Sequence, residues 1–237
     1  MSHSQVHNHS PSTEFIAGAK AIIPLVIGAI PFGIIFGTLA QSSGLSFVGA
    51  IAMSALVFAG SAQFIALGLL ATKTALPIII LTTFVVNLRH LLYSLSLVSH
   101  VQRLSPFWKF ILGFWLTDEV FAVAINRYHK SDRSIHKHWY YFGAAIFMYL
   151  NWQVCTVIGL TLGHLIPNAS NWGLDFAMSV TFIGMVIPYV KNKPMVVTVI
   201  VSGIMALITQ NLPHQSGLIV AATAGVIAGM VTQKINK

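Results

Sequence analysis

The stretch VVNLRHLLYSLSLV, residues 85–98, places an asparagine, an arginine and a histidine close together within one of the most apolar runs of the chain. On an α-helix, with about 100° between successive residues, four of its leucines fall on one side and most of its polar residues on the other. The leucines are Leu88, Leu91, Leu92 and Leu95, and the polar face holds Asn87, Arg89, His90, Tyr93, Ser94 and Ser96. Only Leu97 departs from this pattern. The stretch predicts a two-faced helix whose polar side faces the interior of a helix bundle.

Arg89 is the most informative residue of this helix. An arginine at the centre of a membrane helix costs about 2.5–3.5 kcal/mol on insertion scales, and such residues usually have a partner on a substrate or ion path. A purely structural ion pair and a side chain that reaches the membrane edge are the alternatives. The chain has only five acidic residues, and Asp118 and Glu119 are the two within an apolar segment. We favour Asp118 as the partner. Such a carboxylate could neutralise Arg89, carry a proton or hold an ammonium group; the alternative is that both acids lie in water at the interface.

The composition sets the class of protein. Of the 237 residues, 56 % are hydrophobic and only 8 % are charged, whereas a soluble domain has about 25 % charged residues. We therefore predict an all-α, polytopic membrane helix bundle that lies in the lipid bilayer. The net charge of +8 comes from short connecting segments without a basic face, which argues against nucleic-acid binding. The sequence motifs of zinc proteases, serine hydrolases and phosphate-binding loops are absent, so we do not expect an enzyme.

Helices that cross a bilayer need about 20 mostly apolar residues. Eight segments qualify as spans: Ala21–Ala40, Phe47–Leu70, Leu76–Val98, Phe107–Ala124, Trp139–Leu162, Leu174–Val190, Met195–Thr209 and Leu218–Thr232. The last three are short and the fourth holds two acids. Seven spans, or six with re-entrant segments, therefore remain alternatives to eight.

Positive charges indicate the orientation. In the eight-span arrangement with the N-terminus inside, ten lysines and arginines lie in inside segments and two, Arg103 and Lys109, lie outside. This bias predicts that both termini are cytoplasmic. The segment 100–109 fits poorly, because it is an outside loop that carries both exceptions.

Two predicted spans contain residues that favour irregular helices. Gly60, Ser61 and Gln63 lie at the centre of the second span, where glycine permits a break and the polar side chains can satisfy freed backbone groups. In transporters the N-terminus of such a half-helix often faces a substrate carboxylate; close helix packing is the alternative. Pro24 and Pro31 lie seven residues apart on one face of the first span, where they predict kinks and, more specifically, a gate.

The N-terminus differs from the rest of the chain. Residues 1–15, MSHSQVHNHSPSTEF, are polar, so we predict a disordered tail there and a single transmembrane domain over residues 16–237. Glu14 falls within this tail. Its three histidines have no neighbouring cysteine, so we predict neither a metal site nor a cofactor. Cys155 is the single cysteine and cannot form an intramolecular disulfide. We assign Asn151 and Gln153 to hydrogen bonds between helices.

Four segments in this order, IPFGIIFG (30–37), FAGSAQFIAL (58–67), NLRHLLYSLSL (87–97) and LTDEVFA (116–122), resemble the AzlC family of branched-chain amino-acid exporters. The resemblance covers residues 14–190 well and the last spans more loosely. It implies the larger subunit of an exporter in the bacterial inner membrane, which acts with a small hydrophobic subunit of the AzlD type. It implies substrates such as valine, leucine, isoleucine, methionine and leucine analogues, and it assigns no binding residues.

The residues and the resemblance together predict proton-coupled secondary export of small apolar L-amino acids. We expect Arg89, with backbone amides near Gly60 and Ser61, to hold the carboxylate of the substrate, and Asp118 to hold its ammonium group or a proton. Asn87, Tyr93 and Gln63 complete the predicted substrate-binding set, and Glu119 and His90 are further candidates for proton coupling. A passive channel for a small polar solute and a scaffold subunit of a transport complex are the alternatives.

Overall fold

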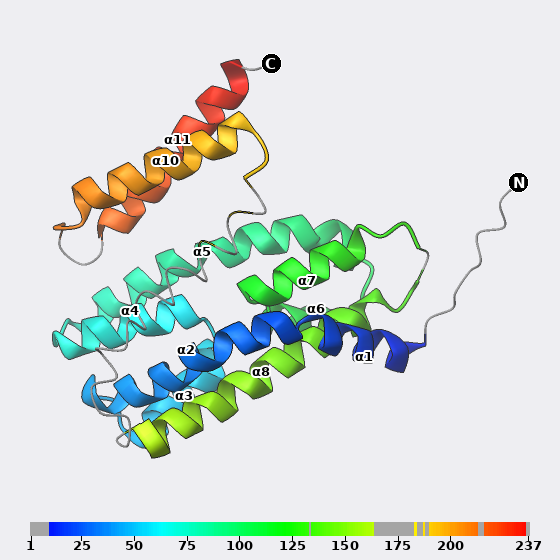
Figure 1. Ribbon diagram of the computed structural model, residues 1–237, viewed down its shortest axis with the longest axis horizontal. Coiled ribbons are helices and arrows are strands. Elements are labelled where there is room, and N and C mark those ends of the chain that lie inside the picture. Colours follow the sequence, from blue (N-terminus) through cyan, green and yellow to red (C-terminus); the bar gives the residue numbers. More distant parts are fainter. Residues whose placement is uncertain are drawn as a thin grey trace, which may run out of the picture. The chain divides into compact units, whose positions relative to one another are not determined.

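The computed structural model describes residues 10–132, 134–163, 183, 187, 190–212 and 216–235. The described residues form helices and no strand, which confirms the predicted all-helical class. The helices in chain order are α1 (Pro11–Ala21), α2 (Ile23–Ser42), α3 (Phe47–Val57), α4 (Gly60–Ala71), α5 (Leu76–Val101), α6 (Pro106–Phe114), α7 (Asp118–Tyr128), α8 (Lys137–Leu162), α10 (Lys193–Thr209) and α11 (Ser216–Ile235) (Figure 1). They belong to two compact units, residues 1–71 with 86–169, and residues 72–85 with 170–237.

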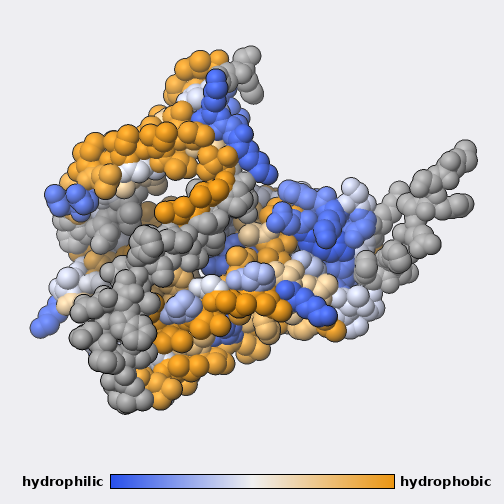
Figure 2. Space-filling view, viewed as in Figure 1, coloured by the Kyte–Doolittle hydropathy of each residue, from blue (hydrophilic) through white to orange (hydrophobic). Residues whose placement is uncertain are grey.

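Three helices, α2, α5 and α8, are long and apolar enough to cross a membrane. They match the first, third and fifth predicted spans, and α10 and α11 match the last two. The predicted span Leu174–Val190 lies almost wholly outside the described residues. Apolar residues cover much of the visible surface of the helices (Figure 2), as expected for a molecule whose solvent is lipid.

The second predicted span is broken, which confirms the expectation of irregular helices. Helix α3 ends at Val57, Phe58 has the left-handed φ of 35°, and α4 begins at Gly60. The side-chain amide Nε2 of Gln63 donates to the carbonyl oxygen of Met53 at 3.1 Å. Ten residues of straight helix would separate these residues by about 15 Å, so α4 folds back beside α3 to form a helical hairpin.

Side chains bind three carbonyl groups near the C-terminus of α3. Besides the bond from Gln63 to Met53, Gln153 donates to the carbonyl of Ser54 at 3.1 Å, and Tyr149 donates to that of Ala55 at 3.2 Å. The carbonyls at the C-terminus of a helix have no partner within the helix and need one in an apolar setting. The bond of Gln153, which lies on α8, confirms the expected role of this residue between helices.

The fourth predicted span, Phe107–Ala124, is not one helix. It divides into α6 and α7 at residues 115–117, where the side chain of Thr117 caps α7 by accepting from the amide of Val120. Asp118 and Glu119 occupy the first turn of α7, where the helix dipole favours negative charge. The sequence Thr-Asp-Glu is thus a helix start within an apolar run, and the prediction that it lies inside one continuous span is wrong.

Helix α7 runs parallel to α5. Asp118 contacts Arg89, the ring of Phe121 stacks on Tyr93 at 4.5 Å, and Tyr128 stacks on His100 at 4.9 Å. Because α5 and α7 are parallel, the chain between them must run back in the opposite direction, and α6 is the helix that does so. Helices α6 and α7 therefore form a second hairpin. The tip of each hairpin contacts Tyr149 of α8, through Phe58 at 4.9 Å and Trp115 at 5.6 Å between ring centroids.

Glycines bring α2 and α8 into close contact. A Cβ atom placed on Gly37 would lie 2.2 Å from the carbonyl oxygen of Thr156, and one on Gly159 would lie 2.0 Å from that of Ile34. Because both partners are backbone atoms, neither can move aside alone. Similar contacts join α1 to α8 at Gly18 and Gly143. Small residues at helix interfaces allow the backbones of membrane helices to approach.

Gly159→Ala should therefore destabilise the protein by about 1–3 kcal/mol, as overpacking does elsewhere. The matched control is Gly28→Ala, because a Cβ atom on Gly28 would meet nothing within 4 Å and alanine is the better helix former. Thermal unfolding of the two purified variants in detergent measures the difference. Equal melting temperatures would show that α2 and α8 do not depend on this contact.

Two further expectations concern the first span. Pro31 lies within α2 as predicted, but Pro24 lies in its first turn, next to Ile22, which joins α1 to α2. Pro24 thus marks the junction between two helices. Helix α1 begins at Pro11, so the described part of the predicted tail, residues 10–15, is mostly helical. Ser10 caps α1 and Pro11 opens it, which is a helix-start pattern.

In the other unit, α10 and α11 form an antiparallel pair. Gly217 lies against Thr209, Gly225 against Ser202 and Gly229 against Thr198.

Candidate functional site

A charged cluster joins α5 to the N-terminus of α7. Arg89 Nη1 lies 2.7 Å from Asp118 Oδ2, and the hydroxyl of Tyr93 donates to Asp118 Oδ1 at 2.6 Å. The side chains of Arg89 and Asp118 are 23 % and 15 % exposed. Asp118 thus has two donors and the positive end of the α7 dipole. The structure brings Arg89 to the partner that we favoured for it.

The rest of this cluster has unused hydrogen-bonding capacity. Asn87 Oδ1, Arg89 Nε and His90 Nε2 are buried and have no hydrogen-bond partner among the described residues. The ring of His90 lies 5.9 Å from that of Tyr93, and Glu119 is half-buried beside Asp118. Buried polar atoms without partners are rare in proteins. The face of α5 that carries them can therefore bind a polar ligand or water.

The predicted two-faced character of α5 is mostly right. The four leucines of the apolar face are exposed, and Asn87, Arg89, His90 and Tyr93 are half-buried. Ser94 and Ser96 are exposed, which contradicts the expected polar interior at these positions. Leu97 is buried, because it lies four and seven residues after Tyr93 and His90 on the same helix face. The interior face therefore turns apolar toward the C-terminal end of α5.

A second group of predicted site residues lies at the break between α3 and α4. Gly60 begins α4, and a Cβ atom there would lie 3.2 Å from the Trp152 ring. Gln63 is fully buried. Ser61 Oγ, Gln63 Oε1 and Trp152 Nε1 have no hydrogen-bond partner among the described residues. No described hydrogen bond or ion pair joins this group to the Arg89 cluster, although the tips of both hairpins contact Tyr149.

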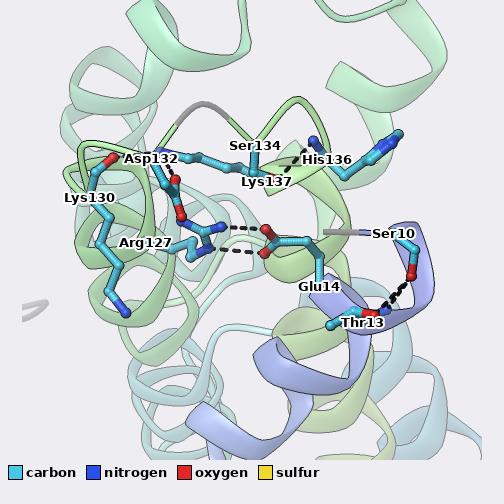
Figure 3. Close-up of polar contacts among 9 residues, drawn as sticks. All are labelled: Ser10, Thr13, Glu14, Arg127, Lys130, Asp132, Ser134, His136 and Lys137. Carbon is cyan, nitrogen blue, oxygen red and sulfur yellow. Dashed lines mark hydrogen bonds and ion pairs between the residues drawn. The ribbon is translucent and has the colours of Figure 1, made fainter. Parts of the chain in front are cut away.

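Sequence reasoning missed a second ion-pair network, centred on Arg127 (Figure 3). Arg127 Nε donates to Glu14 Oε2 at 2.9 Å, and its Nη2 pairs with Glu14 Oε1. Arg127 Nη1 donates to Asp132 at 2.9 Å, and Lys137 Nζ also lies 2.9 Å from Asp132. The network joins α1, α7 and α8. We had placed Glu14 in a disordered tail, whereas its side chain is 1 % exposed.

The start of α1 was readable from the sequence, since Ser10, Pro11 and Glu14 are the residues expected at a helix N-terminus. The hydrogen bond from Arg127, followed by that from Lys137, holds the pKa of Asp132 well below its usual range. Among the described residues no group of three His, Cys, Asp or Glu side chains could hold a metal. His3, His7 and His9 lie outside the described residues.

Comparison with known proteins places these features in context. A family model described as AzlC protein matches residues 24–166, a range that includes both hairpins. The chain is 31 % identical to the inner membrane protein YgaZ of Escherichia coli over 231 residues, 95 % of this chain and 91 % of that protein. It is 34 % identical over 223 residues to an uncharacterized membrane protein of Archaeoglobus fulgidus, over 93 % of this chain and 96 % of that one.

A further relative is the branched-chain amino acid transport protein AzlC of Bacillus subtilis. The two are 31 % identical over 161 residues, 68 % of this chain and 62 % of that protein. No solved structure matches the chain.

Proposed function

Because the chain belongs to the AzlC family of membrane transport proteins, we propose that it exports small apolar L-amino acids across the bacterial inner membrane. The proposed substrates are branched-chain amino acids and methionine. The proposed energy source is the proton gradient, and the proposed partner is a small hydrophobic subunit of the AzlD type. Support comes from the name of the Bacillus relative, which states branched-chain amino acid transport.

One observation carries the proposal. The partly buried pair of Arg89 and Asp118 presents opposite charges within an apolar bundle. An amino acid carries the same two charges, so its ammonium group can replace the guanidinium at Asp118 while Arg89 stays available to its carboxylate. Such an exchange keeps every charge paired, which matters because an unpaired charge in this setting is costly. A sugar or an inorganic ion would match only part of this arrangement.

The neighbouring residues have proposed roles in the same cycle. Tyr93 holds Asp118 in place by its hydrogen bond, and Asn87 can bind a polar group of the substrate. Asp118, Glu119 and His90 are the proposed proton carriers, because they are the two carboxyl groups and the imidazole of the cluster. The junction at Pro24 and the helix interior at Pro31 are the proposed flexible points of α2.

The two hairpins also support a membrane topology. If they are re-entrant segments, α6 and α7 enter and leave the membrane on the same side. The segment 100–109 before them and residues 128–137 after them then both lie on the cytoplasmic side. Eleven positive residues then lie inside, one (Lys73) lies outside and Arg89 lies in the membrane, which accounts for all 13. This distribution of positive residues is more biased toward the inside than the one for eight simple spans, in which ten lie inside and two lie outside. We propose six spans and two re-entrant hairpins, with both termini cytoplasmic.

Cysteine labelling tests this topology. In a Cys155→Ser background, cysteines at Ser105 and Ser134 should react with a membrane-impermeant maleimide only after the cell membrane is opened. A cysteine at Ser43 should react in intact cells. In the proposed topology α2 crosses the membrane from the cytoplasmic side, where Ser134 lies, to the outer side, where Ser43 lies. Eight simple spans instead predict that the cysteine at Ser105 reacts in intact cells. That result would contradict the re-entrant hairpin of α6 and α7.

Amino-acid efflux tests the function itself. Cells fed dipeptides of valine, leucine or methionine should export the free amino acid faster when they carry the chain together with its small partner. A proton-gradient uncoupler should stop this export. Flux that ignores the uncoupler and shows no counterflow would indicate a passive channel. If Arg89 variants no longer assemble with the small partner subunit but still transport amino acids at matched expression, the chain acts as a scaffold subunit.

A further inference from the structure

In the described part of the chain, the polar and aromatic contacts of residues 86–101 to other helices all lie in one seam, where this segment of α5 meets α7. Each of these hydrogen bonds, ion pairs and ring contacts goes to α7 or to His129, the residue that follows α7. Toward the C-terminal ends of both helices, the seam contains in turn the ion pair of Arg89 with Asp118, the stack of Tyr93 on Phe121 and the stack of His100 on Tyr128.

This seam is packed differently from the contacts of α8. Neither α5 nor α7 contains a glycine, and the contacts between them are made by long side chains. By contrast, glycines place the backbones of α1 and α2 directly against α8. Backbones in direct contact cannot shift without a clash, whereas long side chains can separate by changing rotamer. The seam is therefore a contact that can open while the helices around α8 stay together.

Helix α7 is fixed on its other side. Arg127 of α7 pairs with Glu14 of α1, and it also binds Asp132, which Lys137 of α8 contacts at 2.9 Å (Figure 3). These contacts attach α7 to the helices that glycines hold together. Of the described residues 86–101, in contrast, only Leu97 is buried. We therefore expect this segment of α5, and not α7, to move when the seam opens.

The seam leads from the charged cluster to the C-terminal ends of both helices. Arg89 and His100 are separated by about 16 Å along α5. Leu97 lies four residues after Tyr93 and three before His100, which places it on the same face of α5. It is 2 % exposed. Apolar and aromatic side chains thus close the seam between Asp118 and residues 128–137, which the proposed topology places in the cytoplasm.

We propose that the seam between α5 and α7, closed by Leu97 and by the stack of His100 on Tyr128, is the cytoplasmic gate through which the amino acid reaches Asp118. This inference rests on the proposed function. Opening the seam separates the guanidinium of Arg89 from the carboxylate of Asp118, which is costly in an apolar setting. An amino acid that enters pairs with both charges. The empty protein therefore keeps the gate closed, and the substrate stabilises the open state.

A removable cross-link across the seam tests the gate. In a Cys155→Ser background, cysteines replace His100 and Tyr128, and a bifunctional methanethiosulfonate joins them through disulfide bonds. Uptake of labelled leucine into inside-out membrane vesicles, which corresponds to export from cells, is measured with the small partner subunit present. Cross-linking should reduce uptake by about 10-fold or more, because a gate that cannot open admits no substrate. Reduction of the disulfides should restore it.

The matched control is a cysteine pair at Phe15 and Phe142, whose rings lie 5.8 Å apart between α1 and α8. Cross-linking this pair should leave uptake unchanged, because glycines already hold these two helices together. Unchanged uptake after complete cross-linking of His100→Cys to Tyr128→Cys would overturn the gate and leave the proposed function intact. An equal loss of uptake with the control pair would overturn the gate as well.

No uptake of leucine by the unsubstituted chain would contradict the proposed function. In that case, or if the cysteine pair is inactive before cross-linking, alkylation of the purified full chain decides the gate. A cysteine at Leu97 should react with iodoacetamide about 10-fold faster than one at Leu160, because only the seam opens in the folded protein. Leu160 is 7 % exposed and lies where α2 contacts α8. Equal rates of alkylation would overturn the gate.

Discussion

Asp118→Asn should reduce amino-acid export by about 100-fold or more at matched expression. The change removes the charge that we propose receives the substrate's ammonium group, and it leaves Arg89 without its counterion. Breaking a buried charge pair from one side costs about 3–5 kcal/mol, and 3 kcal/mol is a factor of about 150. Efflux of labelled leucine or methionine, normalised to the amount of protein in the membrane, measures the effect.

A double variant separates charge balance from transport. Arg89→Gln with Asp118→Asn removes both charges, so the protein should regain its normal abundance and melting temperature but not its export. Ser96→Ala is the matched control on α5, because Ser96 is exposed and its one hydroxyl bond among the described residues is to a carbonyl of its own helix. Normal export by the double variant would remove Arg89 and Asp118 from the mechanism and leave them as a structural ion pair.

Glu14→Gln should produce the largest loss of stability, about 3–5 kcal/mol. The side chain of Arg127 is 6 % exposed and makes two bonds to Glu14, so the variant leaves a buried guanidinium with one carboxylate partner (Figure 3). Thermal unfolding in detergent measures the change. The effect should extend to α7 and α8, since the network joins them to α1.

Asp132→Asn is the comparison for this variant, because it removes a carboxylate from the same guanidinium. The side chain of Asp132 is 38 % exposed, and ion pairs at the surface contribute about 1 kcal/mol or less. Because the pKa of Asp132 is lowered in the folded state, its contribution is present above its unfolded pKa of about 4 and declines as the pH falls below that value. Equal losses in the two variants would show that burial of Glu14 is unimportant.

The hairpin tips suggest how transport and structure are related. Both tips contact Tyr149, and each is followed by a helix N-terminus that carries predicted site residues. In transporters, half-helices that end inside the membrane place their dipoles and free backbone groups at the substrate.

The amino-acid sequence by itself determined the class of protein and one pair of site residues. A content of charged residues as low as 8 % predicts a surface that faces lipid. Long apolar runs predict the three long helices α2, α5 and α8. Both predictions depend only on the local composition of the chain. Arg89 and Asp118 could be matched because acids are so few that a buried cation has hardly any choice. The break at Gly60 followed from glycine and polar residues at the centre of an apolar run.

Only the tertiary structure decided the directions of the helices and the contacts between distant segments. Nothing local in residues 107–124 determines whether the second half continues or turns back; that depends on Asp118, Phe121 and Tyr128 finding partners on α5. Glu14 could not be assigned to Arg127, 113 residues away, from the polar residues around it. Ser94 and Ser96, which are exposed, were misassigned to the interior for the same reason. Helical periodicity gives the face of a residue, but whether that face is covered depends on which helices pack against it.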